Sequence, residues 1–341
     1  MLLRNSAGEA AGRVVPAEWN SHSHTIVSWP TRDVVWGTLL GQAYEEYVRV
    51  IEELLRYEQV VVVCRDEDRH TVERLVPHGV DVITHPIDDG WIRDNGPLAV
   101  ASPDGLIAVD FSFNSWGGRF TPWSGDSSVG STIAQHLAVF REEVPFVLEG
   151  GAITFDGNGT AVVVEECVLN PNRNGSVSRD TFERVVRRCL GVEKVIWLPY
   201  GLLEDLDNTD GHVDNVAVFV GEGRILAQVV DTENRNHERL ARNIDVLRSS
   251  RDAAGVPLRV ETISWLPYAK MPDGRMQPAP YLNFAITNRS VLIPSVGDAF
   301  DGDAARLIGG LFSRRDPTLV RSYALTYGGG GPHCITMQWP G

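Results

Sequence analysis

The chain has 341 residues, of which 43% are hydrophobic and 22% are charged. That balance excludes intrinsic disorder, which needs low hydrophobicity and high net charge. No apolar run approaches the roughly 20 residues that span a bilayer, so a membrane protein is excluded as well. Forty-five acidic against 31 basic residues give a net charge of −14, which disfavours nucleic acid or an anionic membrane as the main partner.

The cysteines and the N-terminal segment together indicate the cellular compartment of the protein. Residues 1–16 contain no apolar stretch of the kind that secretory signals carry. The four cysteines, Cys64, Cys167, Cys189 and Cys334, form no C-x-x-C pair and no zinc-finger spacing. We therefore expect a cytoplasmic protein whose thiols are free.

In chain order, the first predicted elements are a strand at 25–29, a long helix at 42–57 and an apolar strand at 59–64. The helix carries one apolar face, formed by Tyr44, Tyr47, Val48, Ile51, Leu54 and Leu55 at three- and four-residue spacing. From there the order strand, turn, strand, helix, strand recurs. The four complete units begin with predicted strands at 93–100, 152–155, 213–220 and 282–287, and end with predicted strands at 144–148, 194–198, 257–263 and 319–323.

A fifth unit is incomplete at both chain ends. The predicted strand at 334–339 has no successor, and the strand at 25–29 has no predecessor. Joining the two ends completes the unit, and a ring closed in this way leaves few exposed sheet edges. We therefore predict one α/β domain over residues 1–341, a five-bladed pseudo-symmetric α/β propeller of strand-strand-helix-strand units. Two ordinary α/β domains are the alternative.

Unusual polar residues stand at or just before the first strand of successive units: Asp94, Glu149, His212, Asp214 and Cys334. Equivalent positions in a ring face one axis, so we expect these side chains to converge on one pocket. Cysteine with histidine indicates nucleophilic catalysis through a thiolate. Carboxylates beside a thiol raise its pKa, so the set makes sense with a cation in the pocket. A guanidinium fits, because it pairs with carboxylates through two parallel hydrogen bonds.

Each residue also has a structural interpretation. Asp94 could pair with Arg93 on the surface, His212 could cap a turn, Glu149 could be a turn residue and Cys334 could be a buried strand cysteine. Three ligand patterns fail. The glycines before Cys334 lack the Lys-Ser/Thr of a phosphate loop. Asp205, Asp207 and Asp210 lack the glycine position of a calcium loop, and His22 with His24 lacks further metal ligands.

Several longer motifs run almost from end to end of the chain. They are Pro16–Trp19 with Trp29-Pro30, Trp91–Pro97, Leu148–Asn174, Thr209–Asn215 and Gly330–Thr336. Together they resemble the agmatine deiminases, within the bacterial peptidylarginine-deiminase-type group of guanidino-group-modifying enzymes. The resemblance implies a five-bladed α/β propeller that uses no metal and no cofactor.

The resemblance also implies roles. Cys334 would be the nucleophile and His212 the general acid and base, with Glu149 hydrogen-bonded to His212. Asp94 and Asp214 would bind the guanidinium nitrogens. Trp91 would pack against the substrate, and Gly330 and Gly331 would let the backbone approach it. The implied reaction converts agmatine and water to N-carbamoylputrescine and ammonia, through a covalent amidino adduct on Cys334, in the polyamine metabolism that leads to putrescine.

Four departures from the family pattern concern the far end of the substrate. Asn208 stands beside Thr209 where an acidic residue is usual, in a loop that could contact the distal ammonium of agmatine. Pro280 replaces a common serine, Val296 replaces an aromatic, and Pro332-His333 precedes the cysteine. A deiminase of free arginine, peptidyl arginine or a specialised guanidino metabolite is therefore an alternative, and a binding-only propeller is a remote one. The family often forms homo-oligomers, which this sequence does not reveal.

Overall fold

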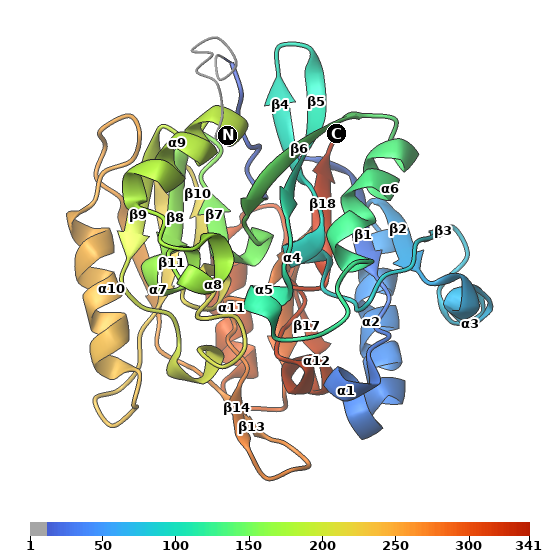
Figure 1. Ribbon diagram of the computed structural model, residues 1–341. Helices are drawn as coiled ribbons and strands as arrows, with labels where there is room; N and C mark the ends of the chain where they lie inside the picture. The colour runs from blue at the N-terminus through green and yellow to red at the C-terminus, as the bar shows by residue number, and fades with distance from the viewer. Residues whose placement is uncertain (1–11) are drawn as a thin grey trace.

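The computed structural model describes residues 12–341 (Figure 1). Most of the segment without a secretory pattern lies outside the described residues. Among the residues that are described, none belongs to a helix long and apolar enough to cross a membrane. The four cysteines are buried, and none of them forms a disulfide within the described residues, as predicted.

Four three-stranded sheets in this part of the chain share one topology, in which the middle strand is antiparallel to the first and parallel to the third. They are β4 (Leu98–Ser102), β5 (Gly105–Ser112) and β6 (Phe140–Val147); β7 (Ile153–Phe155), β8 (Thr160–Val164) and β9 (Lys194–Leu198); β10 (Ala217–Gly221), β11 (Arg224–Gln228) and β12 (Arg259–Ile263); β15 (Ala285–Ile286), β16 (Ser290–Ser295) and β17 (Asp316–Arg321).

One longer helix connects the second strand of each sheet to the third, as a parallel pair requires. These helices are α6 (Val129–His136), α9 (Arg179–Leu190), α10 (His237–Ser249) and α11 (Asp301–Leu311). The α9 helix shows why the sequence predicts them well. Ser178 accepts a hydrogen bond from the Thr181 backbone at its N-terminus, and Gly191 ends it in a left-handed conformation. The predicted strand-strand-helix-strand order is thus present in all four complete units.

The fifth sheet joins the two ends of the chain, as predicted. The C-terminal β18 (Thr336–Pro340) pairs antiparallel with β1 (His22–Ser28), and β1 pairs parallel with β2 (Gln59–Cys64). Figure 1 shows the red β18 beside the blue β1. A fourth strand, β3 (Asp81–Thr84), follows β2 after the short helix α3 (Arg69–Leu75). The strand β3 was not predicted, because one exposed residue and three half-buried residues give no periodic signal.

The helix α2 (Leu40–Leu55) forms the connection between β1 and β2 in this fifth sheet and buries one face. Tyr47, Ile51 and Leu54 are buried as predicted, whereas Tyr44, Val48 and Leu55 lie at the half-buried margin. The buried face also includes Glu46, which the apolar periodicity could not reveal.

Several predicted strands begin too early. The segment at 93–100 opens with the helical turn α4 (Ile92–Asn95), the segment at 213–220 opens with a 3-10 turn at 213–215, and the last strand begins only at Thr336. In each case the residues that carry polar chemistry lie in a turn before the strand. Successive side chains in a strand point to the two faces of the sheet. A turn before the strand can instead direct a side chain beyond the end of the sheet.

The remaining elements are short and were not predicted. They are α1 (Asp33–Trp36), α5 (Ser115–Gly118), α7 (Glu165–Val168), α8 (Pro171–Asn174), α12 (Tyr323–Gly328) and the hairpin of β13 (Tyr268–Lys270) and β14 (Met276–Pro278). Most are single turns, below the length at which helical periodicity can be read.

Candidate active site

The five predicted residues meet in one buried place. Asp94 comes from α4 and Glu149 from the segment after β6. His212 and Asp214 come from the turn before β10, and Cys334 comes from the turn before β18. His212 Nδ1 lies 3.6 Å from Asp94 Oδ1, and Cys334 Sγ lies 3.7 Å from Asp214 Oδ2. No side chain of the five is more than 6% exposed. The structural interpretation of Asp94 as a surface partner of Arg93 is therefore wrong.

Asn283 holds the sulfur of Cys334. Its Nδ2 donates to Sγ at 3.1 Å and to Asp214 Oδ2 at 3.1 Å, so one amide links the thiol to a carboxylate. Asn283 was not predicted as a site residue. The available signal was its position, because it opens the fourth unit just as Asp94 and Asp214 open theirs.

Both oxygens of Asp94 have partners. Trp116 Nε1 donates to Oδ2 at 3.0 Å and the Gly151 backbone N–H donates to Oδ1 at 3.0 Å. Trp116 was not predicted. It lies in α5, after β5, and its backbone has a positive φ, a geometry with no sequence signal at a tryptophan.

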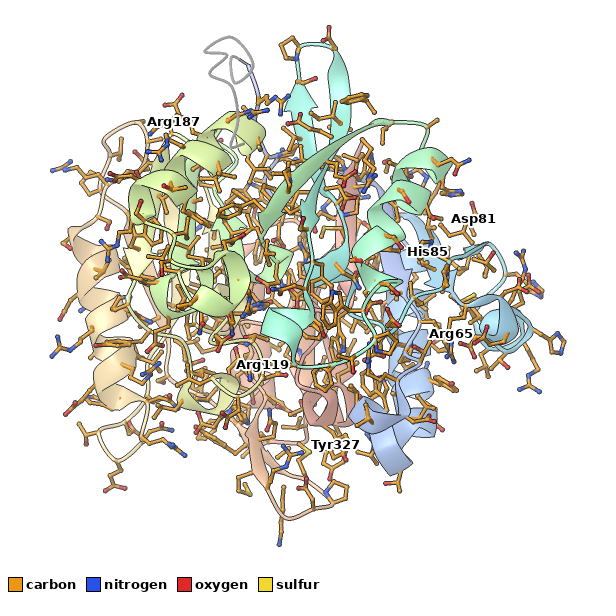
Figure 2. All side chains as sticks on the ribbon, viewed as in Figure 1. Arg65, Asp81, His85, Arg119, Arg187 and Tyr327 are labelled. Carbon is orange, nitrogen blue, oxygen red and sulfur yellow. The ribbon has the colours of Figure 1, made fainter. Side chains whose placement is uncertain are left out.

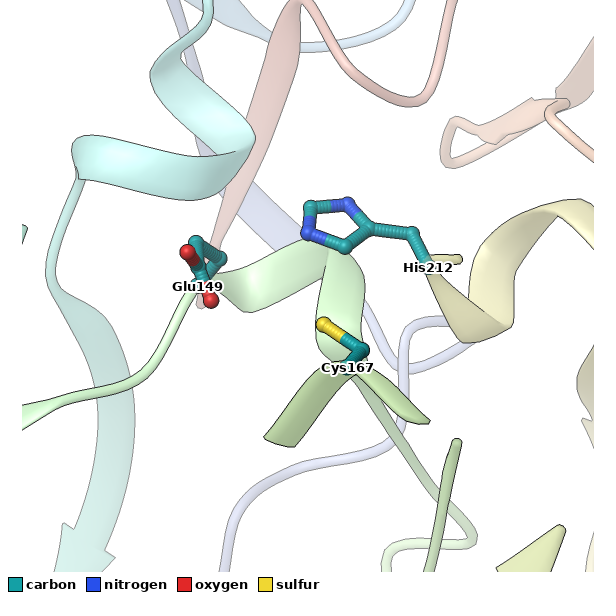
Figure 3. A group of neighbouring side chains, drawn as sticks. All are labelled: Glu149, Cys167 and His212. Atoms are coloured by element: carbon teal, nitrogen blue, oxygen red, sulfur yellow. The ribbon is translucent and has the colours of Figure 1, made fainter. Parts of the chain in front are cut away.

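Glu149 differs from its predicted role. No hydrogen bond joins it to His212 within the described residues. Instead its Oε1 accepts from Arg173 Nε at 2.5 Å, and Arg173 Nη2 donates to the Thr209 carbonyl at 2.8 Å. Glu149 thus reaches His212 indirectly, through the loop that carries it. Figure 3 shows the carboxylate of Glu149, the imidazole of His212 and the thiol of Cys167 directed toward one space.

Asp205 organises the loop before His212. Its Oδ2 accepts from Thr209 Oγ1 at 2.6 Å and from the His212 backbone N–H at 2.9 Å. Arg119, labelled in Figure 2, donates to the Leu206 carbonyl at 2.8 Å from outside this loop. Asp205, one of the three aspartates considered as part of a calcium loop, therefore positions His212.

Two glycines leave room where a side chain would intrude. A Cβ at Gly151 would lie 2.6 Å from His212 Nδ1 and 2.7 Å from Asp94 Oδ1. A Cβ at Gly330 would lie 2.4 Å from the Trp91 ring and 3.1 Å from Cys334 Sγ. Gly330 was predicted as a position of close approach; Gly331 instead packs against Asn283.

The pocket above the thiol has aromatic walls and a polar floor. It is lined by Val35, Trp91, Asp94, Trp116, Phe120, Asn208, Thr209, His212, Asn215, Gly328, Gly329 and Cys334. The predicted contacts Trp91, Asn208 and Thr209 therefore belong to it. Pro280 and Val296 do not line it.

Trp91 is fixed in place on its far side. Its ring stacks on Trp36 with centroids 5.1 Å apart, and its Nε1 donates to Asp89 Oδ2 at 2.9 Å. A wall held in this way presents a rigid face to a flat ligand.

Burial and charge set the protonation of the site. Burial raises the pKa of Cys334 well above its usual value, and Asp214 and Asp94 raise it further. For His212, burial lowers the pKa, but Asp94, Cys167 and Asp214 together raise it well above its usual value. These surroundings thus favour the protonated thiol and the charged imidazole.

Within the group of five predicted residues, two buried polar atoms have no hydrogen-bond partner among the described residues, His212 Nε2 and Asp214 Oδ1. Buried polar groups are nearly always satisfied, so such atoms indicate a place where a ligand completes the bonding. One group of described residues also has the composition of a metal site. The ligand atoms of Glu149, Cys167 and His212 lie within 4.8 Å of one another.

Comparisons with known proteins identify the family of this chain. The family model described as Porphyromonas-type peptidyl-arginine deiminase matches residues 14–340. The agmatine deiminase of Stutzerimonas stutzeri is 36% identical over 100% of this chain and 99% of its own, and that of Pseudomonas fluorescens is 35% identical over the same shares. A solved structure of the agmatine deiminase of Enterococcus faecalis superposes with a TM-score of 0.92 at 29% identity, covering 99% of this chain and 98% of that one. The chain belongs to the Porphyromonas-type peptidyl-arginine deiminase family and is an enzyme, a hydrolase that acts on C–N bonds.

Proposed function

We propose that this enzyme deiminates a guanidino substrate, and that agmatine is that substrate. Water converts agmatine to N-carbamoylputrescine and ammonia, a step toward putrescine in polyamine metabolism. The observation that carries the proposal is a buried thiol beside two carboxylates, because they raise the pKa of the thiol and a bound cation would offset them and favour the thiolate.

Asp94 and Asp214 bind the guanidinium nitrogens. The unpartnered Oδ1 of Asp214 is free to accept an N–H from the cation. The aromatic walls of Trp91 and Trp116 match a flat, delocalised cation. Its charge offsets the two carboxylates, so the pKa of Cys334 falls when substrate binds and the thiolate forms where it is needed.

The thiolate of Cys334 then adds to the guanidinium carbon. An amide anion cannot leave, so the charged His212 protonates the departing nitrogen and ammonia is released. A cationic amidino thioether remains, held by the same carboxylates. Water, deprotonated by the now neutral His212, attacks the carbon, the sulfur leaves and the ureido product forms.

Glu149 acts in this scheme as a positioning residue. It fixes Arg173, which holds the Thr209 carbonyl and thereby the turn that carries His212. Gly151 and Gly330 keep the space around the reacting carbon open.

Pocket chemistry favours agmatine over free arginine. None of the described residues that line the pocket is lysine or arginine, so the carboxylate of arginine would find no charged partner. The relatives at 35–36% identity are named agmatine deiminases. Asn208 lines this pocket where an acidic residue is usual in the family. Deimination of a different guanidino compound is therefore the second candidate function.

We also propose that the five sheets are the blades of one propeller, closed by the β1–β18 pair, and that residues 1–341 form one catalytic domain. The repeated topology and the family match over 14–340 support both statements. Buried free thiols support a cytoplasmic setting.

The test is kcat/KM for agmatine, arginine and arginyl peptides, measured by formation of the ureido product. Agmatine should have the highest value. Cys334→Ala should release no ammonia, while Cys64→Ala, a buried thiol in β2, should remain active as the matched control. Arginine exceeding agmatine would contradict the substrate, and turnover by Cys334→Ala would contradict the nucleophile. A mass increase on Cys334 during turnover would establish the adduct.

A further inference from the structure

We propose that Glu149, Cys167 and His212 form a binding site for a zinc-class divalent cation, and that a bound cation inhibits the enzyme. Cys167 has no part in the proposed reaction. Cation binding is independent of the proposed function, whereas inhibition rests on it, because it requires His212 to act as the acid and base.

The three side chains converge in a closed space. Their potential ligand atoms lie within 4.8 Å of one another, and each residue is at most 1% exposed. Within residues 12–341, no other group of three histidine, cysteine or acidic side chains comes as close. The residues come from the segment after β6, from α7 and from the turn before β10, so the fold and not a local motif assembles them (Figure 3).

The ligand types suit zinc. Thiolate sulfur, imidazole nitrogen and carboxylate oxygen are its usual protein ligands, and three of them leave a fourth position for water. Ligand atoms around tetrahedral zinc lie about 3.5 Å apart. The side chains here must therefore close by roughly 1 Å, a movement within the reach of χ rotations.

His212 supplies an independent indication of a ligand. Its Nε2 is buried and has no hydrogen-bond partner among the described residues. An unsatisfied buried nitrogen is unfavourable, and coordination to a cation would give it a partner. The unpartnered atom belongs to the same imidazole that faces Cys167 and Glu149 in Figure 3.

The other two ligands are available at little cost. The thiol of Cys167 makes two long hydrogen bonds: it donates to the Thr209 carbonyl at 3.4 Å and accepts from Arg173 Nη2 at 4.0 Å. Arg173 holds one oxygen of Glu149, which orients the carboxylate and leaves its second oxygen for a cation. The positive charge of Arg173 is itself balanced by Asp210, its other acidic partner.

Coordination would stop turnover through the histidine. With Nε2 on the metal, His212 can neither protonate the leaving nitrogen nor deprotonate water. Cys334 is not one of the three proposed ligands, and its Sγ contacts Asn283 and Asp214 instead. The cation would therefore not coordinate the nucleophile. Inhibition should therefore be reversed by a chelator.

Binding of Zn²⁺ to the full-length enzyme, measured with a colorimetric chelator as competitor, tests the site directly. Unaltered enzyme, Cys64→Ala and Cys334→Ser should bind one Zn²⁺ with affinities within about threefold of each other. Cys167→Ala should bind at least about 30-fold more weakly, since a first ligand is lost. Cys167→Ser, which keeps the side-chain volume, should behave like Cys167→Ala, and thermal unfolding verifies that both are folded. Anomalous scattering at the zinc edge should place one ion among the three residues.

Equal Zn²⁺ affinity of Cys167→Ala and unaltered enzyme would overturn the proposal, and so would a zinc ion bound to Cys334. Absence of Zn²⁺ binding by unaltered enzyme at about 1 mM, the concentration that corresponds to a very weak Kd, would overturn it as well. The two proposals fail separately. Cys167-dependent binding in an enzyme that turns over no guanidino compound would refute only the proposed function. Agmatine turnover with no Cys167-dependent binding would refute only the cation site.

Discussion

At the scale of single residues, the pKa of Cys334 follows from its carboxylate neighbours. Burial, Asp214 and Asp94 all raise the pKa of this thiol. Removing one negative charge should lower that pKa, so Asp214→Asn should react faster with iodoacetamide at pH 7, by about tenfold if the pKa falls by about 1. Mass spectrometry of the Cys334 peptide measures the rate. Glu52→Gln, in α2 and away from the site, is the control and should leave the rate unchanged; a slower Asp214→Asn would contradict the electrostatic explanation.

Gly151 tests the shape of the site. In Gly151→Ala the added methyl group would lie 2.6 Å from His212 Nδ1 and 2.7 Å from Asp94 Oδ1. We expect kcat/KM to fall by at least about 100-fold, because a displacement of about 1 Å has that effect on catalysis. Gly41→Ala is the matched control, since nothing lies within 4 Å of its Cβ. Near-normal activity of Gly151→Ala would show that the pocket adapts.

His333 connects the site to the N-terminal part of the chain. Its Nδ1 lies 2.8 Å from Asp214 Oδ2 and its Nε2 lies 3.1 Å from Glu18 Oε1. Burial alone would raise the pKa of Glu18, but the positive charges of His333 and Arg93 lower it to about 2. A carboxyl group with a depressed pKa stabilises the folded state above its unfolded value of 4.5, and this contribution is lost as the pH falls toward 2.

Glu18→Gln should therefore lower the free energy of unfolding at pH 7 by about 1–3 kcal/mol. The difference from unaltered enzyme should shrink between pH 4.5 and 2, the window set by this pKa. Urea unfolding at several pH values measures both. A constant difference at all pH values would show that Glu18 acts through packing alone.

At the scale of elements, α2 carries a buried acid that holds α12. Glu46 accepts hydrogen bonds from the backbone N–H groups of Ala324 and Leu325, both at 3.0 Å. These N–H groups belong to the first turn of α12 and have no acceptor within that helix, so Glu46 caps them. The helix α12 leads into the glycine loop before Cys334.

Glu46→Ala should lower the free energy of unfolding by about 2–4 kcal/mol, because it leaves two buried donors unpaired and opens a cavity. Thermal or urea unfolding measures the loss. Glu45→Ala, one residue away on the exposed side of α2, should change stability by less than about 0.5 kcal/mol. Equal effects of the two substitutions would refute the capping role.

At the scale of the whole molecule, stability depends on joining the chain ends. β18 covers one edge of β1, and its side chains Met337 and Trp339 are buried. Deleting residues 336–341 removes these side chains and exposes the β1 edge, which favours aggregation. We expect loss of the cooperative thermal transition seen by circular dichroism, whereas deletion of Gly341 alone should keep it. A truncated chain that melts cooperatively would show that the other four sheets are stable alone.

Much of this organisation could be predicted from sequence, because helices and strands follow local patterns. The long helices and the repeated unit were predicted to within a few residues. The turns that carry Asp94, Asp214 and Cys334 were predicted as strands, since short polar turns give no periodicity. Asn283 and Trp116 were missed as site residues for a related reason, because only the fold shows which side chains a given atom contacts.

The order of elements, the residue types of the site and the family could all be inferred from the sequence, because local patterns and motifs carry them. The pairing of side chains in the site became visible only in the folded chain. Glu149 accepts a hydrogen bond from Arg173 and not from His212. Cys167 lies near the imidazole of His212, whose Nε2 has no partner among the described residues. Hydrogen bonds between distant segments depend on ångström-scale placement, and no spacing along the chain encodes that.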